Sequence, residues 1–329
     1  MRPPRIHVPA PPAHTLVAPH GPQHARRTRT AAAALVAAVG LTLTGCATSP
    51  PATTSTTDRL SVVAAFYPLQ WALASVGGDH VEVTSLTASG AEPHDLELSP
   101  QQVADVADAQ LIVYINGFQP SVDDAVAQNP DGALDAGADV ERLDVASGSS
   151  ASDAPSPARD PHIWLDPRNM ATIIDAIAGR LSALDPANAK TYASNAMTTK
   201  DKLNSLDRDW ASGTATCASR DLVVAHDAFG YLAKRYGFTQ IGISGLSPDA
   251  EPSPAKLAEV TDFVRAHDVA TIYYETLVDP KVAETIATET GTATAVLDPL
   301  EGLTEGSTQD YLSVMRTDLA TIRQGQHCT

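Results

Sequence analysis

A single long helix between two runs of shorter elements is the feature that most constrains this chain. Residues at alternating steps of four and three form one stripe: Tyr192, Ala196, Thr199, Leu203, Leu206 and Trp210. This spacing is typical of the buried face of an α-helix. Asp185 is a suitable N-cap, and Pro186 suits the first turn. We therefore predict a helix over residues 185–212, about 40 Å long, that joins two lobes; an ordinary surface helix is the alternative.

The segments on either side of this helix alternate between strand and helix patterns. Before it, apolar runs predict strands over residues 60–66, 81–86, 111–115, 140–143 and 163–165. After it, similar runs predict strands over residues 222–225, 239–243, 269–274 and 292–297. Short strands separated by helices form βα units with a mostly parallel sheet. We therefore predict an α/β fold: a lobe of residues 60–184, the long rigid helix 185–212, and a second lobe of residues 213–329.

The two lobes share one local pattern. Ser99-Pro100 and Ser253-Pro254 each open a predicted helix with a serine N-cap and a first-turn proline, and each helix leads to an apolar strand. The pattern favours two lobes of similar architecture, although two unrelated capped helices would look the same.

The first 45 residues have the composition of an export signal. Arg26, Arg27 and Arg29 precede an apolar run over residues 31–43, which is too short to span a bilayer. The run ends in Leu43-Thr44-Gly45-Cys46, which resembles a bacterial lipobox and implies cleavage before Cys46 and lipid on its thiol. A plain signal peptide with a coincidental cysteine is the alternative. Residues 46–59 are typical of a flexible tether, so we expect an extracytoplasmic, membrane-anchored lipoprotein.

The rest of the chain is strongly acidic. None of the 39 acidic residues but five of the 22 basic residues lie in residues 1–45, so residues 46–329 carry a formal net charge of −22. This charge argues against nucleic acid as a partner and suits an exported protein or one that binds a cation. Besides Cys46, the chain contains Cys217 and Cys328, and in an oxidising compartment such a pair predicts one disulfide.

Four possible metal ligands follow predicted strands. His94, His162 and His226 lie in three different βα units, and Asp298 ends the apolar run before Pro299. In open α/β sheets, ligands gather beyond the carboxyl ends of the strands, so two residues from each lobe would face each other across a cleft. Three imidazoles and one carboxylate form a tetrahedral donor set within the range of zinc. Taken singly, each histidine is more often structural.

Three motifs, each around one histidine, resemble those of the metal-binding lipoproteins of zinc/manganese ABC importers, the cluster A-I (cluster 9) solute-binding family. They are Pro-His-Asp-Leu-Glu-Leu-Ser-Pro at residues 93–100, Asp-Pro-His-Ile-Trp-Leu-Asp-Pro at 160–167 and His-Asp-Ala-Phe-Gly-Tyr-Leu-Ala-Lys-Arg-Tyr-Gly at 226–237. The resemblance covers residues 60–323 in order. It implies two α/β lobes joined by a rigid helix, a buried metal between them, and delivery of that metal to a membrane permease.

The same resemblance assigns the metal ligands. It implies that His94, His162 and His226 bind the metal, and that Asp298, in Leu297-Asp298-Pro299-Leu300, supplies the carboxylate. Many zinc-type members carry a histidine-rich loop before the second motif. Residues 146–159 of this chain, which we expect to form a mobile loop, contain no histidine. That departure argues against an accessory metal site and leaves the main site unaffected.

Three further acids are candidates for supporting the site. Glu275 matches an acidic position of the family that lies near the metal without binding it. Asp95 and Asp227 each follow one of the histidines directly, and a carboxylate there is suited to hold an imidazole N–H. The alternative is that Asp95 and Asp227 are exposed acids without a role in the site.

These features favour a monomeric binding protein that captures Zn²⁺ for an ABC-type importer. Manganese, or both metals, is an alternative cargo, although manganese prefers more oxygen ligands than this set offers. An adhesin-like surface lipoprotein with a structural metal is a second alternative. A secreted zinc hydrolase is disfavoured, because four protein ligands would close the coordination shell and the sequence contains no His-Glu-x-x-His run.

Overall fold

The computed structural model describes residues 59–144 and 159–329, which belong to one structural unit. The predicted export signal, the lipid attachment at Cys46, nearly all of the tether and residues 145–158 lie outside the described residues. Among the helices of the two described ranges, none combines the length and the apolar character that a membrane crossing requires.

Four parallel strands form the first sheet, in the order β2-β1-β3-β4. The strands are β1 (Leu60–Ala64), β2 (Val81–Ser85), β3 (Leu111–Tyr114) and β4 (Ala133–Asp135). The connections contain α1 (Tyr67–Gly77) with the 3₁₀ turn η1 (Gly78–His80), α2 (Pro100–Asp108), and α3 (Pro120–Val126) with η2 (Pro130–Gly132). The central strands β1 and β3 are apolar and largely buried, as expected where helices cover both faces of a parallel sheet.

The second sheet repeats this arrangement, in the order β6-β5-β7-β8, again with all strands parallel. Its strands are β5 (Asp221–Val224), β6 (Thr239–Gly242), β7 (Thr271–Tyr274) and β8 (Ala293–Val296). The connecting helices are α6 (Gly230–Tyr236), α7 (Pro254–Ala266) and α8 (Lys281–Thr290). The predicted α/β class with two parallel sheets is therefore confirmed, whereas the residues at which one lobe ends and the next begins stay a prediction.

The helices α2 and α7 occupy the same place in the two sheets, between the second and third strand. The side chain of Ser99 accepts a hydrogen bond from the backbone N–H of Gln102, and that of Ser253 accepts one from the backbone N–H of Lys256. The shared Ser-Pro pattern is thus a pair of N-caps at equivalent positions.

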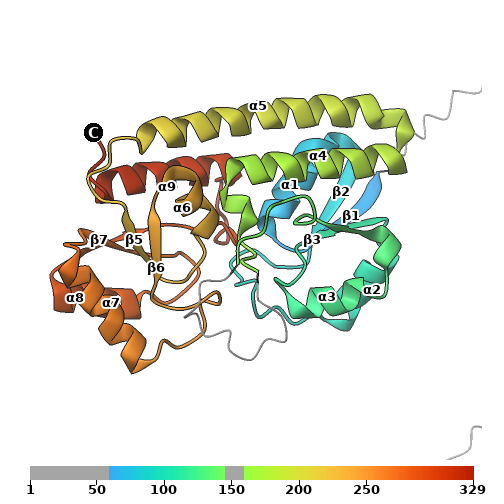
Figure 1. Cartoon of the computed structure of the whole chain (residues 1–329). Helices are drawn as coiled ribbons and strands as arrows, with labels where there is room; N and C mark the ends of the chain where they lie inside the picture. The colour runs from blue at the N-terminus through green and yellow to red at the C-terminus, as the bar shows by residue number, and fades with distance from the viewer. Residues whose placement is uncertain (1–58, 145–158) are drawn as a thin grey trace, which may run out of the picture. The chain divides into compact units, whose positions relative to one another are not determined.

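The long helix is α5 (Ala189–Gly213), which begins later than expected. Residues Pro186–Asn188 form the 3₁₀ turn η4, and the Asp185 carboxylate accepts hydrogen bonds from Asn188 and Tyr192 instead of capping a helix. The predicted stripe is correct, since all six of its residues are buried. Figure 1 shows α5 lying along both α4 (Pro167–Leu184) and α9 (Tyr311–Gly325), so it packs over both halves of the fold.

Two strand predictions are wrong. The fourth strand of the first sheet lies at Ala133–Asp135 rather than at 140–143, and all three of its residues are half-buried, so it lacks an apolar run. Residues Ile163–Leu165 form the 3₁₀ turn η3 instead of a strand. They are consecutive and fully buried, and such a short apolar run does not distinguish a strand from a buried turn.

The hydrophobic core is continuous across both halves, and it includes Trp164, Trp210 and Tyr311. A second, smaller cluster lies between the second sheet and the helices α7 and α8, with Val260 and Ile286 among its members. The outer layer of the second half therefore has a core of its own.

A buried charge on α5 connects three helices. The Asp207 carboxylate accepts hydrogen bonds from the guanidinium of Arg235 on α6 at 2.8 Å and from that of Arg168 on α4 at 3.2 Å. Burial opposes the charge of Asp207, but the two guanidinium groups hold the pKa of its carboxyl below the ordinary value. These two ion pairs thus join the long helix to both halves of the fold.

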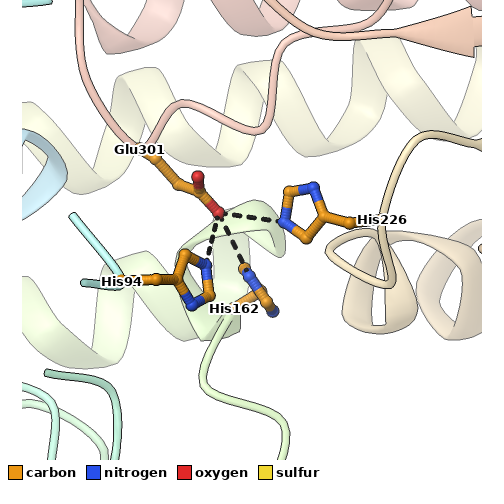
Figure 2. A group of neighbouring side chains, drawn as sticks. All are labelled: His94, His162, His226 and Glu301. Atoms are coloured by element: carbon orange, nitrogen blue, oxygen red, sulfur yellow. Dashed lines mark hydrogen bonds and ion pairs between the residues drawn. The ribbon is translucent and has the colours of Figure 1, made fainter. Parts of the chain in front are cut away.

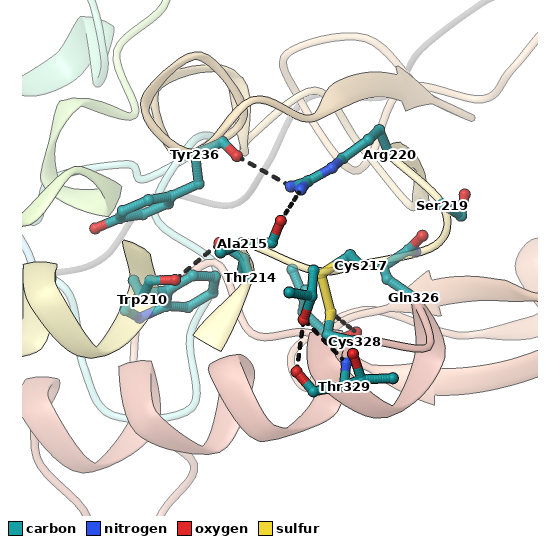
Figure 3. The surroundings of a disulfide bond; sticks show 12 residues. Trp210, Thr214, Ala215, Cys217, Ser219, Arg220, Tyr236, Gln326, Cys328 and Thr329 are labelled. Atoms are coloured by element: carbon teal, nitrogen blue, oxygen red, sulfur yellow. Dashed lines mark hydrogen bonds between the residues drawn. A yellow bond between two sulfur atoms is a disulfide. The ribbon is translucent and has the colours of Figure 1, made fainter. Parts of the chain in front are cut away.

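The predicted disulfide between Cys217 and Cys328 is present and joins the segment after α5 to the end of the chain (Figure 3). The neighbouring backbone is also paired, because the N–H groups of Ala218 and Ser219 both donate to the carbonyl of Gln326. The C-terminal segment is thus fixed against the start of the second half.

Candidate metal centre

Three imidazoles and one carboxylate from distant parts of the chain meet at a single point (Figure 2). The Nε2 atoms of His94, His162 and His226 lie 3.1, 3.2 and 3.1 Å from Oε1 of Glu301. His94 lies in the loop after β2 and His162 directly precedes η3, whereas His226 follows β5 and Glu301 follows β8. The carboxyl ends of parallel strands are where an open α/β sheet places its ligands.

The four side chains are withdrawn from solvent. His162 is 0% exposed, His226 1% and Glu301 2%, while His94 retains 8%. The rings of Phe118 and His94 pack in a T-shaped arrangement, with 4.6 Å between their centroids. The site is therefore buried, and His94 is the member nearest to solvent.

Two further carboxylates fix the orientation of two imidazoles. Asp160 Oδ1 lies 2.8 Å from Nδ1 of His162 and also accepts the backbone N–H of that residue. Glu275 Oε1 lies 2.8 Å from Nδ1 of His226. A carboxylate that accepts the Nδ1–H of an imidazole leaves Nε2 facing the centre, and this arrangement is common around metal-binding histidines.

The charges of the site shift the pKa values of its members in different directions. Burial disfavours the charged form of His226, but Glu301 and Glu275 outweigh it and raise the pKa of His226 to about 10. Burial likewise opposes the charge of His162, and Asp160 and Glu301 raise its pKa. For His94 burial prevails and lowers the pKa. Burial would raise the pKa of Glu301, but the three imidazoles hold it well below the ordinary value.

The carboxylate at the centre is Glu301 and not Asp298, the residue predicted there from the sequence. The carboxylate of Asp298 accepts two other hydrogen bonds instead, both at 2.8 Å: Oδ1 accepts the backbone N–H of Leu300 in its own loop, and Oδ2 accepts the hydroxyl of Thr276, which follows β7. Leu300 has a φ of 59°, in the left-handed region, and the chain bends at the next residue, Glu301, whose carboxylate lies at the centre. Which acid of this loop reaches the centre depends on local backbone geometry, which the periodicity and spacing of the sequence do not reveal.

Comparison with known proteins identifies the family of this chain. Residues 62–325 match the family described as zinc-uptake complex component A, periplasmic (ZnuA). The chain belongs to this family. The predicted resemblance to zinc-type solute-binding proteins is thereby confirmed.

Relatives of this ZnuA-family chain carry zinc in their names. The zinc-binding lipoprotein AdcA of Streptococcus pneumoniae is 36% identical over 278 residues, which is 81% of this chain and 56% of that protein. The high-affinity zinc uptake system protein ZnuA of Bacillus subtilis is 34% identical over 282 residues, which is 81% of this chain and 87% of that protein. The chain thus spans little more than half the length of the AdcA relatives and most of the ZnuA relative.

Solved structures with the same fold include two from streptococci. The Zn(II)-bound ZnuA-like domain of AdcA from Streptococcus pneumoniae is 36% identical with a TM-score of 0.70, and the match covers 82% of this chain and 99% of that domain. The laminin-binding protein Lmb of Streptococcus agalactiae is described as bifunctional, with adhesin and metal transporting activity. It is 34% identical with a TM-score of 0.73, and the match covers 81% of this chain and 99% of that protein.

Of the three acids predicted to support this ZnuA-family site, each has different contacts. Glu275 contacts an imidazole, as described above. Asp95 is exposed, and its backbone N–H donates to Glu92, which lies with Asp95 and Asp249 in a group of acids at the surface. Asp227 Oδ1 accepts a hydrogen bond from Gln240 at 3.0 Å.

Sequence reasoning missed two members of the site. Glu301 stands only three residues after Asp298, and nothing in the local pattern distinguishes the two acids. Asp160 lies inside the second histidine motif, two residues before His162, and that spacing is a signal for a carboxylate that accepts from the imidazole.

Proposed function

We propose that this ZnuA-family protein captures Zn²⁺ outside the cytoplasm and passes it to an ABC-type metal importer, with His94, His162, His226 and Glu301 as the ligands. The observation that carries the proposal is the convergence of three Nε2 atoms on one carboxylate oxygen. The separations of 3.1–3.2 Å are close to the distance of about 3.3 Å between ligand atoms around a tetrahedral zinc with bonds of 2.0–2.1 Å.

The donor set favours zinc over manganese. Imidazole nitrogen is a borderline ligand that suits zinc, whereas manganese prefers sites with more oxygen. Only Glu301 contributes oxygen to the proposed coordination shell, since Glu275 and Asp160 are each directed at an Nδ1 atom. Relatives whose names state zinc binding or zinc uptake support the same choice.

Transport fits the site better than catalysis or a structural role. Four protein donors fill a tetrahedral shell, whereas catalytic zinc keeps a position open for water. A structural zinc supplies folding energy that a small domain lacks. The present site adjoins an extensive hydrophobic core, so the fold has other sources of stability.

The place of action follows from the first residues of the chain. We propose that the segment before Cys46 is an export signal and that lipid on Cys46 anchors the protein at the outer face of the membrane. An extracytoplasmic position lets the protein meet free metal before an importer does. The family's description as periplasmic supports this placement.

Metal competition tests the proposal. Metal-free protein, prepared with a chelator, is titrated with Zn²⁺ and Mn²⁺ at pH 7 against a chromophoric competitor. We expect one high-affinity zinc site per chain and a preference for zinc by orders of magnitude. His226→Glu should narrow that preference, because it adds an oxygen ligand.

The matched control is His267→Ala. His267 contacts Asp221 at the surface of the second half and not the site, so its loss should leave both affinities unchanged. Equal affinities of the wild-type protein for the two metals, or unfolding of the protein when zinc is removed, would overturn the proposal.

A further inference from the structure

The turn that delivers Glu301 has an unusual backbone. Leu300 adopts a left-handed conformation with a φ of 59°, although it is not a glycine, and its side chain is fully buried. Such a conformation is unfavourable for residues with a Cβ and persists only where the surroundings impose it. The contacts around residues 298–301 therefore determine where the Glu301 carboxylate lies.

Each residue of the turn before Glu301 is held by a hydrogen bond. Leu300 is held through its N–H by the Asp298 carboxylate, as described above. The N–H of Asp298 donates to Oδ1 of Asp318 on α9 at 3.1 Å. The carbonyl of Pro299 accepts the indole N–H of Trp164 at 2.7 Å.

Trp164 connects the two halves of the site. It lies in η3, two residues after His162, and is 0% exposed. Its own carbonyl accepts the hydroxyl of Tyr311 on α9. The backbone that carries a first-half ligand and the backbone that carries Glu301 are thus joined through one indole.

Asp318 is a buried carboxyl group that contacts this turn. It is 2% exposed, and its Oδ2 has no hydrogen-bond partner among the described residues. Burial raises the pKa of Asp318 well above its ordinary value. A buried polar atom without a hydrogen-bond partner costs folding free energy. The position of the Asp318 carboxyl beside the turn therefore needs an explanation other than stability.

We propose that Trp164 and Asp318 are positioning residues that hold the turn at residues 298–301 and thereby place the Glu301 carboxylate against the three imidazoles. The proposal rests on the function proposed above. A positioning role differs from a general stabilising role: substitution of either residue should lower the metal affinity by displacing Glu301.

The structure provides a matched control in Trp210. This tryptophan is also 0% exposed, and its indole N–H also donates to a backbone carbonyl of the second half, that of Met315, at 3.1 Å. Trp164→Phe and Trp210→Phe remove the same kind of hydrogen bond. Only the first of these bonds lies at the turn that carries Glu301.

The experiment measures zinc affinity, thermal unfolding of the metal-free protein, and the visible absorption spectrum of the Co²⁺-loaded protein. We expect Trp164→Phe to weaken zinc binding by about tenfold or more, as for other residues that orient a ligand, and to alter the Co²⁺ spectrum. Trp210→Phe should lower the unfolding temperature while affinity stays within about twofold of wild type. Equal effects of the two variants on affinity and spectrum would overturn the proposal.

A double-mutant cycle separates positioning from other effects. In a Glu301→Ala background, Trp164→Phe should change zinc affinity by less than about twofold, because the ligand through which it acts is gone. A full additional loss in that background contradicts the proposal. Absence of zinc binding in the wild type refutes the proposed function, whereas binding that is insensitive to Trp164 refutes only the positioning role.

Asp318 provides a second test if Trp164→Phe does not fold. Asp318→Asn keeps an oxygen that accepts the N–H of Asp298, so it should bind zinc within about twofold of wild type. Asp318→Leu removes that acceptor and should weaken binding by about tenfold. Indistinguishable affinities of the two variants would count against the proposal.

Discussion

In the first sheet the proposed ligands follow β2 and β4, whereas in the second they follow β5 and β8. Both sheets have the same strand order, and their capped helices α2 and α7 occupy equivalent places. The repeat in the fold therefore does not extend to the ligands. The parallel topology determines which edge of each sheet is available, and the loops at that edge decide which residue reaches the centre.

The halves also differ in how they are packed. The helices of the first sheet share the main core with α5 and α9, while α7 and α8 of the second sheet rest on a separate cluster. The strand β8 is mostly exposed, with Val296 at 37%. Two further links, the ion pairs at Asp207 and the disulfide, hold the second half from outside its sheet.

The largest expected effect tests whether the two halves contribute equally to the site. His162→Ala removes a ligand of the first half and His226→Ala one of the second. Loss of a partner behind a ligand commonly costs 10–100-fold in metal affinity, so loss of the ligand itself should cost more than about 100-fold in each case. Competition titration with a chromophoric chelator measures both.

The companion variants act on the carboxylates behind those imidazoles. Asp160→Asn and Glu275→Gln should each weaken zinc binding by about 10–100-fold. A markedly smaller loss for either variant would mean that its half of the site is held in place by other contacts.

The disulfide should matter for the second half alone. Replacing both Cys217 and Cys328 by serine opens a loop of 111 residues and should cost about 5 kcal/mol of stability in the chain-entropy model. Zinc affinity should change by less than about twofold, because the bond lies at the end of α9 away from the ligands. Urea unfolding with and without reductant checks the first expectation, and a large loss of affinity would show that the C-terminal segment positions the site.

The ion pair on α5 should contribute stability that depends on pH. Asp207→Ala removes the carboxylate that Arg168 and Arg235 contact and leaves Arg235 with its 3.8 Å contact to Asp166. It should destabilise the fold by about 2 kcal/mol, as expected for the loss of hydrogen bonds to a charged group. Because the folded pKa of Asp207 is lowered, its contribution is present above the unfolded value of about 3.9 and is lost as the pH falls through the folded value. The difference in unfolding free energy between wild type and variant should therefore be smaller at pH 3 than at pH 7. An equal difference at both pH values would show that the charge of Asp207 is not its source.

The smallest effect compares the two equivalent helix caps. Ser99→Ala removes one member of a reciprocal capping box, whereas Ser253→Ala removes a single cap bond. Each should cost about 1 kcal/mol, with the larger loss at Ser99. Chemical denaturation of the two variants gives the ranking, and a larger loss at Ser253 would show that the second half tolerates less local damage than the first.

Local patterns in the sequence predict most of this fold, because periodicity and capping depend on neighbouring residues. The stripe from Tyr192 to Trp210 and the caps at Ser99 and Ser253 are examples. The strand β4 escapes such reasoning because Ala133–Asp135 is short and half-buried, and η3 because three consecutive buried residues have no period.

The three histidines come together because each lies at the carboxyl edge of a sheet, which the order of elements predicts. The fourth residue depends on tertiary contacts. Asp298 and Glu301 have the same chemistry and lie three residues apart, and they differ in their surroundings: the residues before Glu301 combine the left-handed backbone of Leu300 with hydrogen bonds from Asp298 and Pro299 to distant partners on α9 and η3. No pattern within the loop carries that information.

The spacing of the four residues along the chain has a consequence for how the protein is made. His94 and Glu301 are separated by 207 residues, and the two sheets must both form before those side chains meet. Contacts of such long range form late in folding, because loop closure precedes them. A nascent or partly folded chain therefore contains no complete site, and metal selectivity arises only at the end of folding, when the last helix has docked.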